Sequence, residues 1–125
     1  MAKILILEKD QSLSDNMQEI LELEGHELKE IDSVNDLKDG FCAFKPDLFI
    51  LSAFLERYAS GPELVNLLRK YHQIPVMFVS DVYSQVRFEA EIEAISNTII
   101  LKKPFKAKTL VQKVKEALVL AGKSV

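Results

Sequence analysis

Charged and hydroxyl side chains stand directly after short apolar runs at four places in this chain of 125 residues. Carboxylates of this kind can hold a divalent cation, and an ammonium group opposes one. A hydroxyl can act as a nucleophile where a base activates it. Any chemistry of the chain is therefore to be sought among these groups, if the fold brings them together. The residues concerned are Glu8, Lys9, Asp10, Ser52, Ser80, Asp81 and Lys103.

Two periodicities alternate along the chain and predict the elements that must position these groups. Compact apolar runs predict strands, and apolar residues at helical spacing predict a helix after each strand. Gly25 is expected to end the first helix, and Ser33 with Asp36 to cap the second. The predicted strands cover residues 3–7, 28–31, 47–51, 76–79 and 98–101. The predicted helices lie around residues 13–21, 36–45, 64–71, 83–95 and 110–118.

This strict alternation predicts an α/β fold with a parallel sheet, right-handed crossovers and helices on both faces. No linker or repeat interrupts it, so residues 1–125 are expected to form a single domain. Sites in such sheets lie beyond the carboxyl ends of the strands. The groups named above stand at those ends, so the fold is expected to gather them at one edge.

Composition and charge exclude several classes of function. The formal net charge of −3 argues against nucleic-acid binding as the main task. The first apolar run, residues 4–7, is too short for a signal peptide or a membrane span, so we expect a cytoplasmic protein. The single cysteine, Cys42, excludes an internal disulfide and is expected to pack in the second helix. His26 and His72 lack metal-ligand spacing.

Four sequence segments in this order make the chain similar to a known family. KILILEKD, PDLFILS, IPVMFVS and KKPF lie at the first, third, fourth and fifth predicted strands. With these segments the chain resembles the CheY-like receiver domain of bacterial two-component response regulators, nearly end to end. The resemblance implies a flavodoxin-like, doubly wound three-layer sandwich with strand order 2-1-3-4-5. It also implies a phosphorelay signalling module, which is not an enzyme.

The resemblance further implies a phosphorylation site, of which this chain keeps only part. In the family an aspartate ending the third strand accepts a phosphoryl group, two acids hold Mg²⁺, and a lysine contacts the phosphoryl oxygens. Lys103 and the Ser80 hydroxyl stand at matching positions, whereas Ser52 replaces the aspartate. Ile100 replaces the switch aromatic, and Asp81 stands where a small residue is usual. The chain is therefore expected to be a degenerate receiver, without a phosphoacceptor aspartate.

The acidic pair of the family aligns with Glu8 and Lys9, so one acid has become a base. An ammonium about 5 Å from a dication is repelled by roughly 7 kcal/mol at an effective dielectric constant near 20. We therefore expect Mg²⁺ binding to be weak or absent and no other cofactor. Lys9 is expected to take the place of the metal by pairing with a nearby acid, and Lys103 to pair with one of the same acids. These acids are Glu8, Asp10 and Asp81.

The face of the fourth helix, fifth strand and fifth helix reports phosphorylation in the family, and here it is the expected protein-binding surface. Arg87 and Lys106 are candidate contacts, and Tyr83 and Phe88 are either contacts or core residues. Lys102, Lys103, Lys106 and Lys108 form either a solvated basic patch or a docking site for an acidic partner. The expected partner is a protein, and a second copy of this chain is one candidate. Neither a membrane nor nucleic acid is expected as a partner.

Three functions stay open at this point. The leading interpretation is a receiver-like module that acts by protein contacts without a phosphoryl switch. The first alternative is a receiver that still switches through a non-standard acceptor such as Ser52, for which Asp81 or Glu8 would be the base. The second alternative is a flavodoxin-like module that binds a small ligand at the strand ends.

Overall fold

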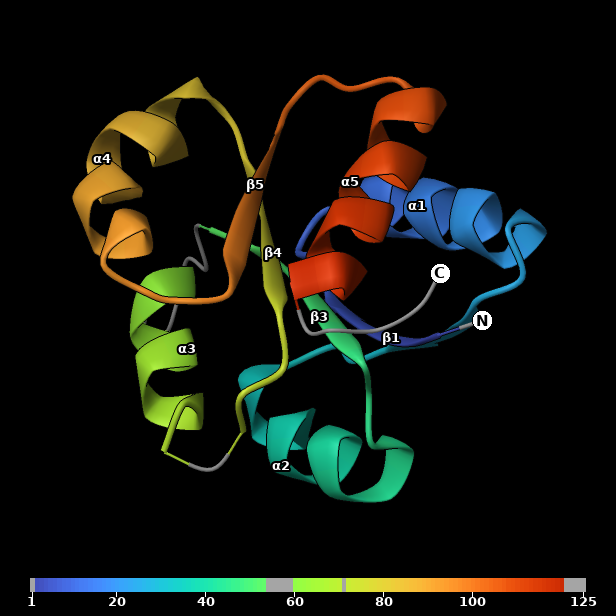
Figure 1. The fold of residues 1–125 in the computed structure, drawn as a ribbon, viewed down its shortest axis with the longest axis horizontal. Coiled ribbons are helices and arrows are strands. Elements are labelled where there is room, and N and C mark those ends of the chain that lie inside the picture. Colours follow the sequence, from blue (N-terminus) through green and yellow to red (C-terminus); the bar gives the residue numbers. More distant parts are fainter. Residues whose placement is uncertain (1, 54–59, 71, 121–125) are drawn as a thin grey trace.

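The elements of the chain alternate between strand and helix (Figure 1). The computed structural model describes residues 2–53, 60–70 and 72–120. The strands are β1 (Lys3–Leu7), β2 (Glu27–Glu30), β3 (Leu48–Ser52), β4 (Val76–Ser80) and β5 (Thr98–Lys102). The helices are α1 (Gln11–Leu23), α2 (Leu37–Asp39), α3 (Gly61–Leu68), α4 (Val82–Glu93) and α5 (Ala107–Leu120). A 3₁₀ turn, η1 (Val34–Asp36), precedes α2, and a π-helical turn, η2 (Gly40–Phe44), follows it.

The strands form one parallel sheet of five in the described part of the chain, in the order β2-β1-β3-β4-β5. Its register pairs Ile4 with both Leu28 and Leu48. The outer strands are β2 and β5, and β2 is only half-buried in alternation, as expected for an edge strand. The predicted α/β fold and strand order are confirmed.

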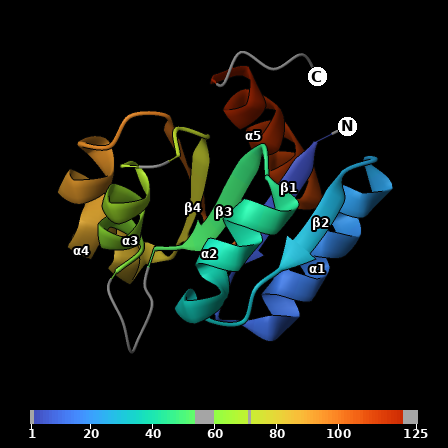
Figure 2. The same ribbon diagram turned by 90° about the horizontal axis from the view of Figure 1, so that it is seen from below.

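Two hydrophobic clusters sandwich the sheet, because successive strand residues point to opposite faces. Ile4 and Ile6 pack with Met17 of α1 and Val114 of α5, whereas Leu5 and its alternate neighbours face η2, α3 and α4. Figures 1 and 2 show this division, with α1 and α5 on one side of the sheet and α2, α3 and α4 on the other. The three layers of the predicted sandwich are therefore present.

Strands β3, β4 and β5 each run one residue further than the sequence predicted. Ser52 pairs with Val79, and Ser80 pairs with Lys102, so the ladder of β-bridges extends into the polar residues. Strand β1 has the predicted limits. The extension matters for the site, because it places both hydroxyl residues on rigid strand ends rather than on a loop.

The second helix differs most from the prediction. Instead of one α-helix capped by Ser33, the chain forms η1, a single turn of α2 and then η2. The Ser33 hydroxyl donates to the Asp36 carboxylate at 3.2 Å rather than capping the helix. Lys45 ends η2 in the left-handed conformation with φ 53°. The predicted packing of Cys42 is also wrong, because its neighbour Phe41 faces the core and leaves Cys42 exposed.

Helix limits elsewhere follow local signals. Asp10 caps α1 by accepting a hydrogen bond from the Leu13 N–H at 3.3 Å. Gly25 adopts φ 88° just after α1, which confirms its predicted place. Ser60 caps α3 by accepting from the Glu63 N–H at 3.2 Å. Among the described residues, no helix combines the length and the apolar character that crossing a membrane requires.

Candidate functional site

The carboxyl ends of the central strands bring the predicted site residues to one edge of the sheet. Ser52 ends β3, Ser80 ends β4, and Glu8 follows β1 directly. Lys103 follows β5, and its N–H donates to the Ser80 carbonyl at 2.8 Å. The order β1-β3-β4-β5 places these ends side by side. The gathering expected from the parallel sheet is therefore present.

A buried ion pair occupies this edge. The Lys103 Nζ lies 2.8 Å from the Glu8 Oε1, and the Glu8 side chain is 0% exposed while that of Lys103 is 23% exposed. The pair joins the start of the β1–α1 connection to the β5–α5 connection, where Lys103 and Pro104 are linked by a cis peptide bond. Pairing of Lys103 with an acid, as charge balance predicted, is confirmed.

The second oxygen of Glu8 is less well matched. Within the described residues, Oε2 is buried and no donor reaches it. A buried carboxylate loses the solvation that it would have in water, and attraction to a partner offsets that loss only where its oxygens are well satisfied. The Glu8–Lys103 attraction therefore comes from one short contact. The Lys103 ammonium is the group that offsets the free-energy cost of burying the Glu8 carboxylate.

Both serine side chains at the edge are buried. Ser52 is 2% exposed and Ser80 is 1% exposed. The Ser80 hydroxyl donates to the carbonyl of Asp81 at 3.1 Å, so the backbone holds it locally. Both hydroxyls are therefore shielded from bulk water, and a hydroxyl needs a base beside it before it can act as a nucleophile.

Gly61 brings α3 against the end of β3, a contact that the sequence analysis missed. A Cβ added at Gly61 would lie 2.6 Å from the Ser52 carbonyl oxygen, and the Gly61 N–H donates to the Ala53 carbonyl at 3.1 Å. Only glycine fits this approach. The sequence signal was present in the run Ser60-Gly61-Pro62, a capping residue followed by a glycine and a proline at a helix start.

The remaining charged residues of the predicted cluster lie toward solvent. Lys9, Asp10 and Asp81 are exposed. The Asp10 carboxylate caps α1, which gives it a structural partner. Pairing of Lys9 with an acid stays a prediction.

The donor groups at this edge do not fit a magnesium ion. One oxygen of Glu8 is bound to the Lys103 ammonium, and Lys9 supplies a positive charge where the family has a second acid. Ser52 adds a neutral hydroxyl rather than a third carboxylate. Mg²⁺ needs near-octahedral oxygen ligands with carboxylates among them. No group of three possible ligands from His, Cys, Asp and Glu occurs in residues 2–53, 60–70 and 72–120.

The predicted protein-binding face is only partly at the surface. Arg87 and Lys106 are exposed, and the guanidinium carbon of Arg87 lies 5.4 Å from the centre of the Phe88 ring. Phe88 is 6% exposed and packs in the core, so of its two predicted roles the core role is the one observed. Ile100 is half-buried against the same core. The Tyr83 side chain lies outside the described residues.

Comparison with known proteins identifies the architecture. The family model of the response regulator receiver domain matches residues 4–115. An uncharacterized transcriptional regulatory protein, YvcP of Bacillus subtilis strain 168, is 28% identical over 118 residues, which are 94% of this chain and 49% of that protein. The chain thus spans about half the length of this curated relative.

Solved structures agree on the fold. NtrX from Brucella abortus, crystallised with ATP, superposes with a TM-score of 0.87 at 24% identity, over 97% of this chain and 28% of that one. Its receiver domain alone gives 0.83 at 24% identity, over 93% and 98%. The N-terminal domain of the nisin resistance regulator NsrR gives 0.78 at 24% identity, over 94% and 98%.

Proposed function

The chain belongs to the response regulator receiver domain family, and we propose that it is a degenerate receiver that signals by protein contacts, without a phosphoryl switch. It is then a binding module rather than an enzyme. Membership of the receiver family implies two-component signalling, and the altered site implies independence from phosphorylation. Residues 1–125 act as one receiver-like unit, and the cytoplasm is its place of action.

The observation that carries the proposal is the buried pair between Lys103 and Glu8, 2.8 Å apart. The family uses this lysine to contact a phosphoryl group. Here the ammonium is engaged by a carboxylate with 0% side-chain exposure, so an incoming anion must displace a buried charge from its partner. Leaving Glu8 without its partner would cost several kcal/mol, because the carboxylate stays buried.

The missing aspartate and the altered acid pair support the same conclusion. A buried hydroxyl at Ser52 lacks the ionised oxygen that attacks phosphorus in the family. The Lys9 ammonium opposes the cation that would draw in a phosphoryl donor. The acceptor and the metal site are therefore both altered, and neither substitution restores the group that the other removes.

The surface of α4, β5 and α5 is the proposed contact region for a protein partner, with a second copy of the chain among the candidates. Arg87 and Lys106 are among its exposed charged groups, and Ile100 stands beneath it at the position of the switch aromatic. An aliphatic side chain at this position lacks the ring whose inward and outward positions report phosphorylation in the family. The surface is then expected to stay in one state.

Beryllofluoride, a mimic of the phosphoryl group, tests the proposal directly. With Mg²⁺ and beryllofluoride added, the amide NMR spectrum should stay unchanged, because neither the anion nor the metal finds its ligands. A phosphorylatable receiver serves as the positive control. Large shifts around Ser52 and Lys103 would refute the proposal. Intact mass after incubation with acetyl phosphate tests the alternative, since an added phosphoryl group would show that the chain still has an acceptor. Loss of that added mass in Ser52→Ala would identify Ser52 as the non-standard acceptor.

Partial restoration tests which change matters more. Ser52→Asp alone should remain unphosphorylated by acetyl phosphate, because Lys9 still opposes Mg²⁺. Ser52→Asp combined with Lys9→Asp should gain measurable phosphorylation, because an acceptor and a second acid then return together. If the single variant is phosphorylated as fast as the double variant, Lys9 has no part in disabling the site.

A further inference from the structure

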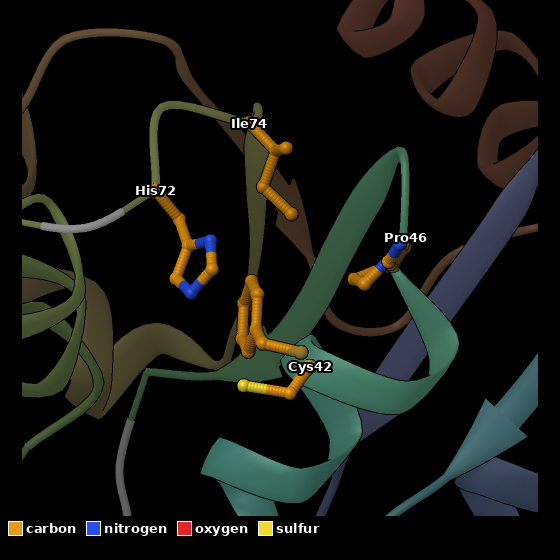
Figure 3. Close-up of a pocket in the computed structure, with 6 residues that line it drawn as sticks. Cys42, Pro46, His72 and Ile74 are labelled. Carbon is orange, nitrogen blue, oxygen red and sulfur yellow. The ribbon is translucent and has the colours of Figure 1, made fainter.

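A second candidate site lies at the opposite edge of the sheet. A pocket of about 310 Å³ opens between η2 and the segment that leads into β4. Figure 3 shows the side chains of Cys42, Pro46, His72 and Ile74 around a common space. We propose that this pocket binds a small, flat aromatic anion. Its lining residues are Phe41, Cys42, Lys45, Pro46, His72 and Ile74.

The pocket lies at the opposite end of the strands from the degenerate phosphorylation site. Pro46 lies two residues before β3, and Ile74 lies two residues before β4, so both stand at the amino ends of parallel strands. Lys103 and Ser52 lie at the carboxyl ends of the same sheet. A ligand here therefore requires nothing of the degenerate phosphorylation site, and the inference does not depend on the proposed function.

An aromatic wall gives the pocket its preference for flat rings. The rings of Phe41 and His72 are stacked, with centres 4.5 Å apart and planes at 28°. Phe41 is anchored from behind by Phe49 of β3, edge to face at 5.4 Å. The His72 N–H donates to the Leu68 carbonyl at 2.8 Å, which ties the backbone of His72 to the end of α3. Because Phe41 is only 4% exposed, a further ring would stack mainly on the half-buried His72 ring, which Phe41 holds in place.

The charge of the lining selects an anion. Lys45 is the lining residue that carries a full positive charge, and the described lining holds no carboxylate. The Lys45 backbone is held in the left-handed conformation, with its N–H donating to the Phe41 carbonyl at 3.2 Å. Pro46 and Ile74 complete an otherwise apolar surface. The volume lies at the lower end of the range of about 300–1,000 Å³ for ligand pockets, which suits one or two fused rings.

Titration with 1-naphthoate tests the inference, with amide chemical shifts as the readout. The shifts should be saturable and centred on residues 41–46 and 72–75, with a dissociation constant on the order of 1 mM for a ligand of this size. The neutral analogue 1-naphthalenemethanol should bind about two- to fivefold more weakly, as expected for loss of an exposed ion pair. An absence of saturable shifts at about 10 mM, well above the expected constant, would overturn the proposal. If the neutral analogue binds equally well, the pocket does not select for negative charge, and that part of the proposal is wrong.

Two variants assign the roles of the lining. Lys45→Met should weaken 1-naphthoate binding about two- to fivefold, whereas Lys38→Met, which removes an exposed lysine of α2 outside the pocket, should leave it unchanged. His72→Leu keeps an apolar side chain against Phe41 but removes the stacked ring, and it should weaken binding about two- to tenfold. Equal effects of the two lysine variants would mean that general surface charge, rather than this pocket, attracts the anion.

The single cysteine provides an independent measurement, because it lies in the lining. Alkylation of Cys42 by iodoacetamide should slow as 1-naphthoate saturates the pocket, with the same dissociation constant as the NMR titration. Alkylation that proceeds at an unchanged rate, together with shifts elsewhere in the spectrum, would place the ligand outside the pocket and contradict the proposal.

Discussion

The two ends of the sheet, at the carboxyl and at the amino ends of its strands, hold a charged side chain in different ways. At the carboxyl edge, the Lys103 ammonium meets one carboxylate oxygen of Glu8 at 2.8 Å. At the amino edge, the Arg69 guanidinium donates to backbone carbonyls, including Ile74 at 2.6 Å and Ser96 at 3.0 Å. The first is a match of charge with charge; the second ties the end of α3 to the segments before β4 and β5. The difference separates an ion pair between two side chains from a side chain that links backbone segments.

The edges also differ in what a lost partner leaves behind. The carbonyls held by Arg69 lie in connections between elements, where water can replace a lost donor. Glu8 has 0% side-chain exposure, so water cannot replace Lys103. Burial lowers the pKa of Arg69, which nevertheless stays charged at neutral pH. The carboxyl edge should therefore be the more sensitive of the two to a single substitution.

The largest effect is expected for Lys103→Met. This change leaves the Glu8 carboxylate buried without a cation, and the free energy of unfolding should fall by about 3 kcal/mol. The double variant Glu8→Leu/Lys103→Met should recover most of that loss, because no buried charge remains. Urea denaturation measures both. If the single variant loses less than about 0.5 kcal/mol, the range of a surface substitution, the pair is not the tightly coupled unit described here.

Arg69→Met should have the next largest effect, about 2 kcal/mol, because several charge-assisted hydrogen bonds are lost and water replaces them in part. Lys70→Met is the matched control, since it removes an exposed cation from the neighbouring position. Thermal denaturation followed by circular dichroism compares the two. A loss at Arg69→Met larger than that at Lys103→Met would reverse the order of the two edges.

Gly61→Ala tests the close contact between α3 and the carboxyl end of β3. The added Cβ would lie 2.6 Å from the Ser52 carbonyl oxygen, so β3 and α3 must separate, at a cost of about 1–2 kcal/mol. Gly40→Ala is the control, because the nearest atoms lie at 3.4 Å and belong to side chains that can adjust. Denaturation midpoints should fall for Gly61→Ala and change little for Gly40→Ala. Equal midpoints would argue against the close contact.

The smallest effect is expected at His26, close to the amino end of β1. Burial lowers its pKa from the ordinary value of 6.5, while the Glu24 carboxylate opposes that shift. Its Nδ1 accepts a hydrogen bond from the Ala2 N–H at 3.2 Å, which requires the unprotonated nitrogen.

The pH dependence follows from that direction. Well above pH 6.5 the imidazole is neutral in both states and has no effect on the pH slope. As the pH falls through 6.5, the unfolded chain binds the proton first because the folded-state pKa is lower, and stability falls. His26→Asn keeps an acceptor but does not titrate, so its unfolding free energy should fall less between pH 7.5 and 5.5. Identical slopes for the two proteins would show that His26 is not linked to folding.

Most of the fold was predictable because it depends on patterns within short windows. The run Ile4 to Leu7 identifies a buried strand, and Gly25 identifies a helix end, without any knowledge of distant residues. The composite second helix was not predictable in this way. Its π-helical turn is accompanied by Gly40 lying against Leu5 of β1, a contact between segments that are far apart in the sequence.

The candidate site was predictable in its residues but not in its geometry. Parallel strands place Ser52, Ser80 and Lys103 at one edge, and charge balance pairs Lys103 with an acid. Which acid it selects depends on side-chain burial, which only the folded structure provides. The roles of Gly61 and Arg69 were missed for the same reason, since each acts through backbone atoms of other elements.

The outer strand β2 has a consequence for how the molecules meet in solution. Glu27 and Lys29 project to solvent from it, alternating with the half-buried Leu28 and Glu30. A further strand that joined the sheet at this border would have to bring its own side chains beside these charges and remove them from water. Copies of the chain should therefore not stack into continuous sheets along β2, and this border keeps the folded protein resistant to strand-by-strand aggregation.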